Sequence, residues 1–238
     1  MNPYQKLMAR KRKWTPVKPT AGQCKLGAED TIHRALALRH MELPVGDFIT
    51  DALSTDVPAA SRDLLRSNVL DEENHDVALG FIASAYGVNE KAEAEAKKLK
   101  AAWEAHPDHT VLKAMVAERS IFFVLLPFFR FNGDAGMRNV SADISRDEQI
   151  HVAANSLVCR ELGLNISPSL DKLRKATINW VMQPLQVGAS DKYLDKKFWL
   201  DSSDRLMYEG KAPELSETKS ARMPAFFEHS NVNLPQYA

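Results

Sequence analysis

The sequence lacks the features that mark secreted, membrane-spanning and nucleic-acid-binding proteins. It has only two cysteines in 238 residues, Cys24 and Cys159, and their spacing does not suit a metal site, so we expect free thiols in a reducing compartment. No apolar run is long enough to span a bilayer and no secretory signal is visible, which predicts a cytoplasmic chain without a membrane span. Lys plus Arg equal Asp plus Glu at 31 each, so no bulk charge attracts nucleic acid.

Strand-like alternation is also missing, as are glycine-rich phosphate loops, nucleophile elbows and Cys-x-x-Cys pairs. Helical periodicity dominates instead and predicts an all-α bundle. The expected helices cover residues 29–53, 60–86, 89–106, 110–131, 142–162, 168–187 and 191–208. Pro44 and Pro127 are the expected sites of a kink or break.

Both ends of the chain differ from this helical part. Residues 1–27 are basic and contain Pro16 and Pro19, so we expect an extended arm. Its basic run, 9–13, is interpreted as a solvated terminus rather than a binding patch. Residues 210–238 contain further prolines and little periodicity, which predicts an extended tail and leaves 28–209 as the helical domain.

Two short motifs with the same Asp-Glu-x-x-His pattern, called the two words below, are the most informative feature of the sequence. Asp71-Glu72-Glu73-Asn74-His75 and Asp147-Glu148-Gln149-Ile150-His151 each place a Glu and a His three residues apart, directly after an Asp. Positions i and i+3 lie side by side on a helix, so each word directs one carboxylate and one imidazole to one point. One such word occurs often by chance, whereas two on long predicted helices are rare.

A bundle that faces two such words toward each other needs a Glu from each of two other helices to complete a two-metal carboxylate site. Glu118 is the only acidic residue in the apolar stretch 110–131, which favours a metal ligand over a partner of Arg119 or Arg130 and over a buried proton carrier. Glu42 precedes Glu72 by the interval at which Glu118 precedes Glu148, so Glu42 is favoured and Glu29 remains the rival. The predicted metal ligands are therefore Glu42, Glu72, His75, Glu118, Glu148 and His151.

The aspartates that precede the two Glu-x-x-His pairs are predicted to orient the histidine ligands. A metal-bound His usually donates its other ring N–H to a carboxylate, which fixes the orientation of the ring. Asp71 and Asp147 are placed to accept these bonds crosswise from His151 and His75, with a solvated helix acid as the alternative. Four carboxylates and two imidazoles favour two iron ions, or manganese with iron, over zinc.

At these residues the chain resembles the ferritin-like di-iron carboxylate superfamily, from about residue 29 to 163. Residues 144–151 are similar to the second metal motif of ribonucleotide reductase small subunits and of several di-iron oxygenases. The resemblance implies a ferritin-like four-helix bundle with additional C-terminal helices, and O₂ activation at two metals bridged by Glu residues. Reductase subunits usually carry a radical Tyr one turn after the first motif His, where this chain has Leu79.

The function expected from this site is that of a non-haem di-iron, or Mn/Fe, oxidase or oxygenase. Leu79, Ile121, Phe122 and Leu125 would form an apolar wall that keeps water out and admits O₂ or an apolar substrate. We expect O₂ and an external electron donor as partners, together with an apolar small molecule or a large reductase subunit; a homodimer is an open alternative. The alternative functions are a divergent ribonucleotide reductase small subunit without the usual radical Tyr and a ferritin-type iron-handling protein.

Overall fold

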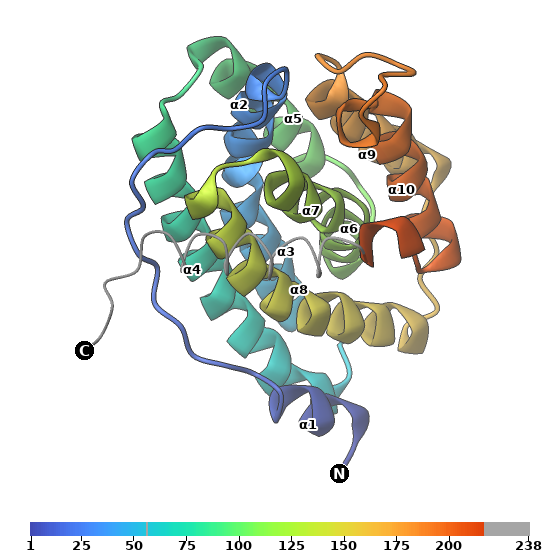
Figure 1. Cartoon of the computed structure of the whole chain (residues 1–238). Coiled ribbons are helices and arrows are strands. Elements are labelled where there is room, and N and C mark those ends of the chain that lie inside the picture. The colour runs from blue at the N-terminus through green and yellow to red at the C-terminus, as the bar shows by residue number, and fades with distance from the viewer. Residues whose placement is uncertain (56, 217–238) are drawn as a thin grey trace, which may run out of the picture.

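The described part of the chain is built from helices (Figure 1). The structure, a computed structural model, describes residues 1–55 and 57–216. Its elements are α1 (Pro3–Met8), α2 (Glu29–Ala37), η1 (Leu38–Met41), α3 (Glu42–Leu53), η2 (Ala59–Ser61), α4 (Arg62–Tyr86), α5 (Glu90–Glu104), α6 (Thr110–Ala117), η3 (Glu118–Phe122), α7 (Phe123–Asn132), α8 (Ala135–Glu161), α9 (Pro168–Met182), η4 (Lys192–Leu194), α10 (Lys196–Glu209) and η5 (Pro213–Ser216).

Over these residues β-pairing is limited to one isolated bridge between Gln186 and Asp195, so the predicted all-α class is confirmed. Four long helical segments form the central bundle: α3 packs on α4 and α6, and α8 packs on α4, α6 and α7. The helices α9 and α10 pack on one side of it, against η3 (Figure 1). No helix within the described ranges is long and apolar enough to cross a membrane.

The first predicted helix is interrupted just before Pro44. The 3₁₀ segment η1 separates α2 from α3. Because Pro44 has no N–H and its ring clashes with the carbonyl four residues earlier, at His40, regular α-helical bonding breaks one turn before it. α3 then runs close to α4, since a Cβ added to Gly46 would lie 3.4 Å from the Cβ of Glu72. The first turn of α3 is thereby brought next to the first Asp-Glu-x-x-His word.

The helix predicted over residues 110–131 is continuous but not uniform. Residues Glu118–Phe122 form a π-helix, η3, between α6 and α7, and Pro127 lies inside α7. The departure from α-helical geometry therefore precedes Pro127. Single π-helical turns are rare and occur frequently at functional sites. This one begins at the Glu predicted to be a ligand.

The later helices differ from the prediction mainly at their ends. α8 begins seven residues before the expected start at 142, because the Asp134 side chain accepts a hydrogen bond from the N–H of Met137 and caps the helix there. α9 ends at Met182 rather than near 187, and α10 begins at Lys196, where Asp195 provides the cap.

The N-terminal arm is only partly extended, which corrects the expectation for residues 1–27. Asn2 and Gln5 form a capping box that starts α1. Tyr4 is buried and donates a hydrogen bond to Glu161 of α8 at 2.7 Å, so α1 is fastened to the bundle. Residues 11–25 have no regular secondary structure and run past α4 to α2 (Figure 1). Of the predicted tail, 210–238, residues 217–238 lie outside the described residues.

Candidate metal centre

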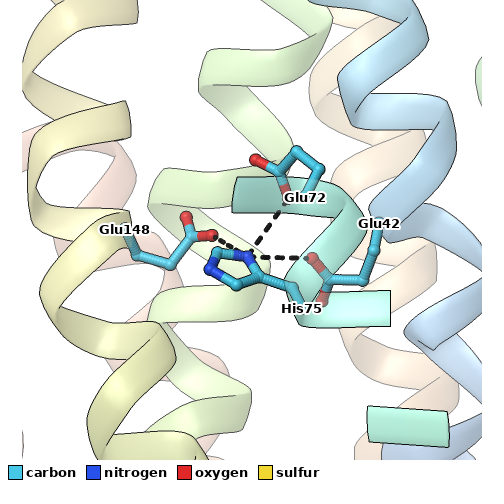
Figure 2. Close-up of side chains that lie close together, drawn as sticks. All are labelled: Glu42, Glu72, His75 and Glu148. Atoms are coloured by element: carbon cyan, nitrogen blue, oxygen red, sulfur yellow. Dashed lines mark ion pairs between the residues drawn. The ribbon is translucent and has the colours of Figure 1, made fainter. Parts of the chain in front are cut away.

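The two Asp-Glu-x-x-His words lie on α4 and α8, which pack against each other. Each word is in the middle of a long helix, so its Glu and His project from the same helix face. All four of these side chains are buried, with at most 1% of each residue exposed: Glu72, His75, Glu148 and His151. Figure 2 shows His75 surrounded by carboxylates from three different helices.

The first group of ligand atoms surrounds Nδ1 of His75 and is called here the His75 position. This nitrogen lies 3.3 Å from Oε2 of Glu72 and 3.3 Å from Oε1 of Glu148. It lies 3.6 Å from Oε2 of Glu42, which α3 contributes. One donor atom from each of these four residues falls within 4.8 Å of all the others, a grouping that could hold a metal ion.

The second group surrounds Nδ1 of His151 and is called the His151 position. Oε1 of Glu72 lies 2.9 Å away, Oε1 of Glu148 3.5 Å and Oε1 of Glu118 3.8 Å. Glu72, Glu118 and His151 form the second grouping of donors within 4.8 Å. Since Glu72 belongs to both groupings and Glu148 approaches both imidazoles, these two carboxylates lie between the positions.

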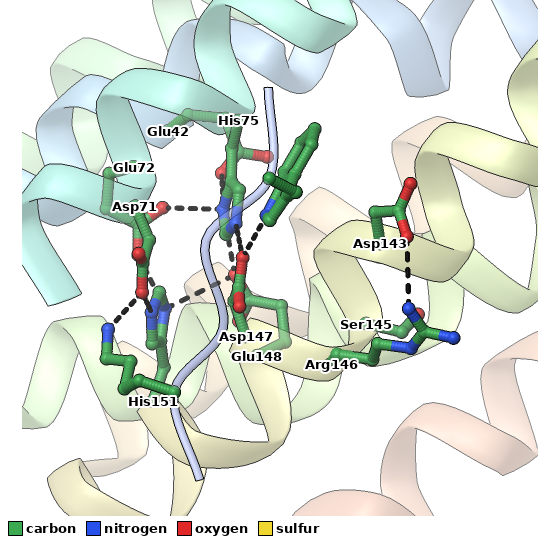
Figure 3. A network of polar contacts seen from close by, with 12 residues as sticks. Glu42, Asp71, Glu72, His75, Asp143, Ser145, Arg146, Asp147, Glu148 and His151 are labelled. Atoms are coloured by element: carbon green, nitrogen blue, oxygen red, sulfur yellow. Dashed lines mark hydrogen bonds and ion pairs between the residues drawn. The ribbon is translucent and has the colours of Figure 1, made fainter. Parts of the chain in front are cut away.

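Both imidazoles are oriented by the predicted aspartates, and the contacts are crosswise (Figure 3). Nε2 of His75 lies 3.3 Å from Oδ2 of Asp147, and Nε2 of His151 lies 2.9 Å from Oδ2 of Asp71. A carboxylate at Nε2 favours the tautomer that carries its proton there. The lone pair of each Nδ1 then points at the glutamates, which is the arrangement a metal cation requires.

The cluster contains many buried polar atoms that have no hydrogen-bond partner. They are Oε2 of Glu42, both carboxylate oxygens of Glu72 and Glu148, Oε1 of Glu118, and Nδ1 of His75 and His151. Leaving so many donors and acceptors unsatisfied in a dry interior is costly, and buried charges are found paired or bound to metals. Because these atoms converge on two points, the residues fit two divalent cations.

The acid–base behaviour of the cluster reflects the same crowding. Burial, followed by the charge of Glu148, raises the pKa of Glu118 well above its usual range, and burial likewise raises the pKa of Glu42. Burial alone would lower the pKa of His75, but the hydrogen bond to Asp147 and the nearby glutamate carboxylates outweigh burial and raise that pKa. Protons and metal cations therefore compete for the same atoms.

Glu118 is held by residues that the sequence did not single out. The side-chain amide of Asn155, on α8, donates to Oε2 of Glu118 at 2.8 Å, which leaves Oε1 directed at His151. Behind η3, Ser203 of α10 donates its hydroxyl to the carbonyl of Ser120 at 2.6 Å, and the buried Arg174 donates to Ser203 at 2.9 Å. Helices α9 and α10 thus support the π-helix from outside the bundle.

The N-terminal arm reaches the centre as well, contrary to the interpretation of its basic run as merely solvated. The ammonium of Lys11 pairs with Oδ2 of Asp71. The indole N–H of Trp14 donates to Oδ2 of Asp147 at 2.6 Å. Figure 3 shows the N-terminal coil passing across this network. No local pattern predicts either contact, because both join a coil to helices far along the chain.

The remaining predicted residues are placed as follows. Glu29 is outside the cluster and accepts a hydrogen bond from the N–H of Gly27 at 2.8 Å, whereas Glu42 is inside it. The predicted apolar wall is buried in the core, one part on α4 and the rest on η3 and α7: Leu79, Ile121, Phe122 and Leu125.

The fold and the cluster define an all-α bundle with a buried two-position Glu/His centre. No protein-family model matches the chain, and no curated protein matches it in sequence. Among solved structures, the chain is similar to the crystal structure of a "putative class I ribonucleotide reductase from Bacillus halodurans". The TM-score is 0.57 over 95% of this chain and 97% of that one, with 13% sequence identity, so the likeness establishes a shared fold.

Proposed function

We propose that this protein binds two iron ions, or manganese with iron, in its bundle and uses them to activate O₂ as an oxidase or oxygenase. The observation that supports this most strongly is the pair of adjoining Glu/His groupings that share Glu72. The donor set also supports it, since carboxylates with imidazoles suit iron and manganese, and no thiolate contributes to either grouping.

Each side chain has a distinct task in this proposal. Glu42 and His75 would hold one cation, and Glu118 and His151 the other, with Glu72 and Glu148 between them. When bound, the metal pair supplies the one-electron chemistry that O₂ reduction needs. The protein supplies charge balance through the four carboxylates and orientation of the imidazoles through the two aspartates.

The surroundings of the cluster favour an oxidase or oxygenase over a reductase that stores a tyrosyl radical. Leu79 stands one turn after His75 and is 5% exposed, and its hydrocarbon side chain cannot hold an oxidising equivalent. Leu79 and Phe122 are both buried, and in this proposal they would keep water from the cluster, which would strengthen its electrostatic interactions and protect reactive species.

The direct test is anaerobic loading with ferrous iron followed by exposure to O₂. We expect about two metal ions per chain by elemental analysis and a transient visible absorption on oxygenation. Glu118→Ala and His151→Ala should lower the metal content. Glu73→Ala is the matched control, because Glu73 neighbours Glu72 in sequence and is exposed. Absence of metal uptake, or equal uptake by all variants, would refute the proposal.

A divergent ribonucleotide reductase small subunit is the second candidate, and the Bacillus halodurans structure is the observation that favours it. This candidate requires a large subunit that binds the chain. A pull-down with a purified large reductase subunit, compared between the full chain and a chain lacking residues 217–238, tests it. A ferritin-type protein would instead elute from size-exclusion chromatography as a large shell.

A further inference from the structure

The two positions differ in what stabilises their supporting aspartates. Both aspartates accept from an Nε2 atom, but their second partners are not alike. Asp147 receives the neutral indole N–H of Trp14, whereas Asp71 receives the cationic ammonium of Lys11. The two positions therefore have a similar geometry, but only the aspartate that supports the His151 position is paired with a cationic side chain.

The Lys11 charge acts at short range in a poorly hydrated environment. The side chains of Lys11 and Asp71 are 11% and 14% exposed, and the imidazole of His151 is fully buried. Salt screens a pair of this kind much less than an exposed pair. The ammonium and the Nδ1 atom of His151 are connected through a single carboxylate and a single ring.

The arm is fastened on both sides of Lys11, so its position is defined. On one side Tyr4 is bonded to Glu161 of α8. On the other, the N–H of Gly22 donates to Asp134 at 2.8 Å, and the N–H of Lys25 donates to the carbonyl of Asn132 at 2.8 Å. The arm between these anchors passes across the metal centre.

Two consequences for metal binding follow from this contact. An ammonium that pairs with Asp71 weakens that carboxylate as an acceptor for His151, so the imidazole becomes a poorer ligand. The ammonium also repels a cation at the His151 position directly. The His75 position has a neutral partner at Asp147 and one more residue in its ligand grouping.

We propose that Lys11 makes the two metal positions unequal, so that the His75 position fills first and Lys11 sets the weaker affinity of the His151 position. This inference rests on the proposed two-metal function. In this proposal the basic arm helps to determine how many metal ions are bound. A difference in affinity would also allow the two positions to hold different metals when one metal is scarce.

Equilibrium binding of Mn²⁺ to the full chain, followed by the electron paramagnetic resonance signal of the free ion, tests this inference. We expect the wild-type chain to bind two Mn²⁺ ions in two steps. Lys11→Met, which removes the charge and keeps most of the apolar stem, should tighten the weaker step about tenfold, the scale of effects seen for groups that support metal ligands. The tighter step should change less than twofold.

Three further variants make the result specific. Lys11→Arg retains the charge and should bind like the wild type, as should Lys13→Met, since Lys13 is exposed on the same arm. Glu118→Ala should abolish the weaker step and so identify it as the His151 position. Lys11→Gln gives a second neutral variant, and circular dichroism verifies that each variant is folded.

The outcomes separate this inference from the proposed function. If the wild-type chain binds no Mn²⁺, the two-metal proposal itself is wrong, and this inference with it. If the wild-type chain binds two ions but the neutral Lys11 variants leave the weaker step unchanged or weaken it, the role of Lys11 alone is overturned. A tightening in Lys11→Arg equal to that in Lys11→Met also overturns it, because charge would not be the cause.

Discussion

At the scale of single residues, the candidate centre consists of buried carboxylate and imidazole atoms that have no hydrogen-bond partner. Glu42 and Glu118 reach the cluster from different helical segments, and burial raises the pKa of both carboxyl groups. The imidazoles also have raised pKa values, because their carboxylate contacts outweigh the effect of burial. Glu42, Glu118 and the two imidazoles thus belong to the candidate ligand set and also have a raised affinity for protons.

Metal binding should therefore release protons. Because its carboxylate contacts raise the pKa of His75, a cation that binds Nδ1 competes there with a proton. Affinity for Mn²⁺ should rise with pH through the neutral range for the same reason. An indicator dye in weakly buffered solution measures the protons released per ion, and pH-independent affinity without proton release would contradict this expectation.

Asn155 should matter through Glu118 rather than through direct ligation. Replacing it with Ala removes the hydrogen bond to Oε2 and frees the carboxylate to rotate. We expect Asn155→Ala to weaken Mn²⁺ binding at the His151 position about tenfold. The His75 position should be unaffected, and equal weakening of both steps would show a general loss of structure instead.

At the scale of elements, the π-helix η3 is an irregular turn inside the bundle, and α10 contacts it from outside. The Ser203 hydroxyl bonds to the Ser120 carbonyl inside η3 and accepts a bond from Arg174. Arg174 is itself held by Asp204 at 2.6 Å and by Asp171 at 2.9 Å. The helices that follow the bundle thus stabilise the turn that carries Glu118.

Ser203→Ala should consequently destabilise the protein and weaken its metal site together. It removes the hydrogen bonds of the Ser203 hydroxyl to the Ser120 carbonyl and from Arg174, at a cost of about 1–3 kcal/mol. Urea unfolding measures the loss. Ser202→Ala is the matched control, because the Ser202 hydroxyl bonds to the carbonyl of Phe198 within its own helix. Equal effects of the two substitutions would contradict the supporting role of α10.

At the scale of the whole molecule, the candidate metal centre joins all four segments of the bundle. Its candidate ligands come from α3, α4, η3 and α8, so a bound pair of cations would crosslink every segment of the bundle. The N-terminal arm adds a fifth segment through its contacts to Asp71 and Asp147.

Metal loading should therefore raise thermal stability. A ligand at a hundred times its dissociation constant stabilises the folded state by about 2.7 kcal/mol per site, which corresponds to roughly 5–10 °C in a chain of this size. Calorimetry with and without Mn²⁺ measures the shift. Glu118→Ala should lose part of it and Glu73→Ala none, whereas an unchanged melting temperature in the wild type would argue against tight binding.

The all-α class and the two words could be predicted because both depend on local spacing. A Glu and a His three residues apart must share a helix face wherever the helix packs, and an Asp before each Glu faces the partner helix in the same way. The resulting crosswise contacts, from Asp147 to His75 and from Asp71 to His151, are present in the structure. That these residues bind metals remains a prediction.

Other features were decided only by the tertiary structure. Packing placed Glu42, just after η1, in the cluster and left Glu29 outside it, and packing brought Ser203 of α10 against the π-helical turn. Lys11 and Trp14 reach the centre through a coil whose path no periodicity encodes. The sequence by itself determined which side chains share a helix face, because helix geometry is repetitive. Only packing decided which distant segments meet there and which of the two positions lies beside a cation, because those contacts depend on the whole fold.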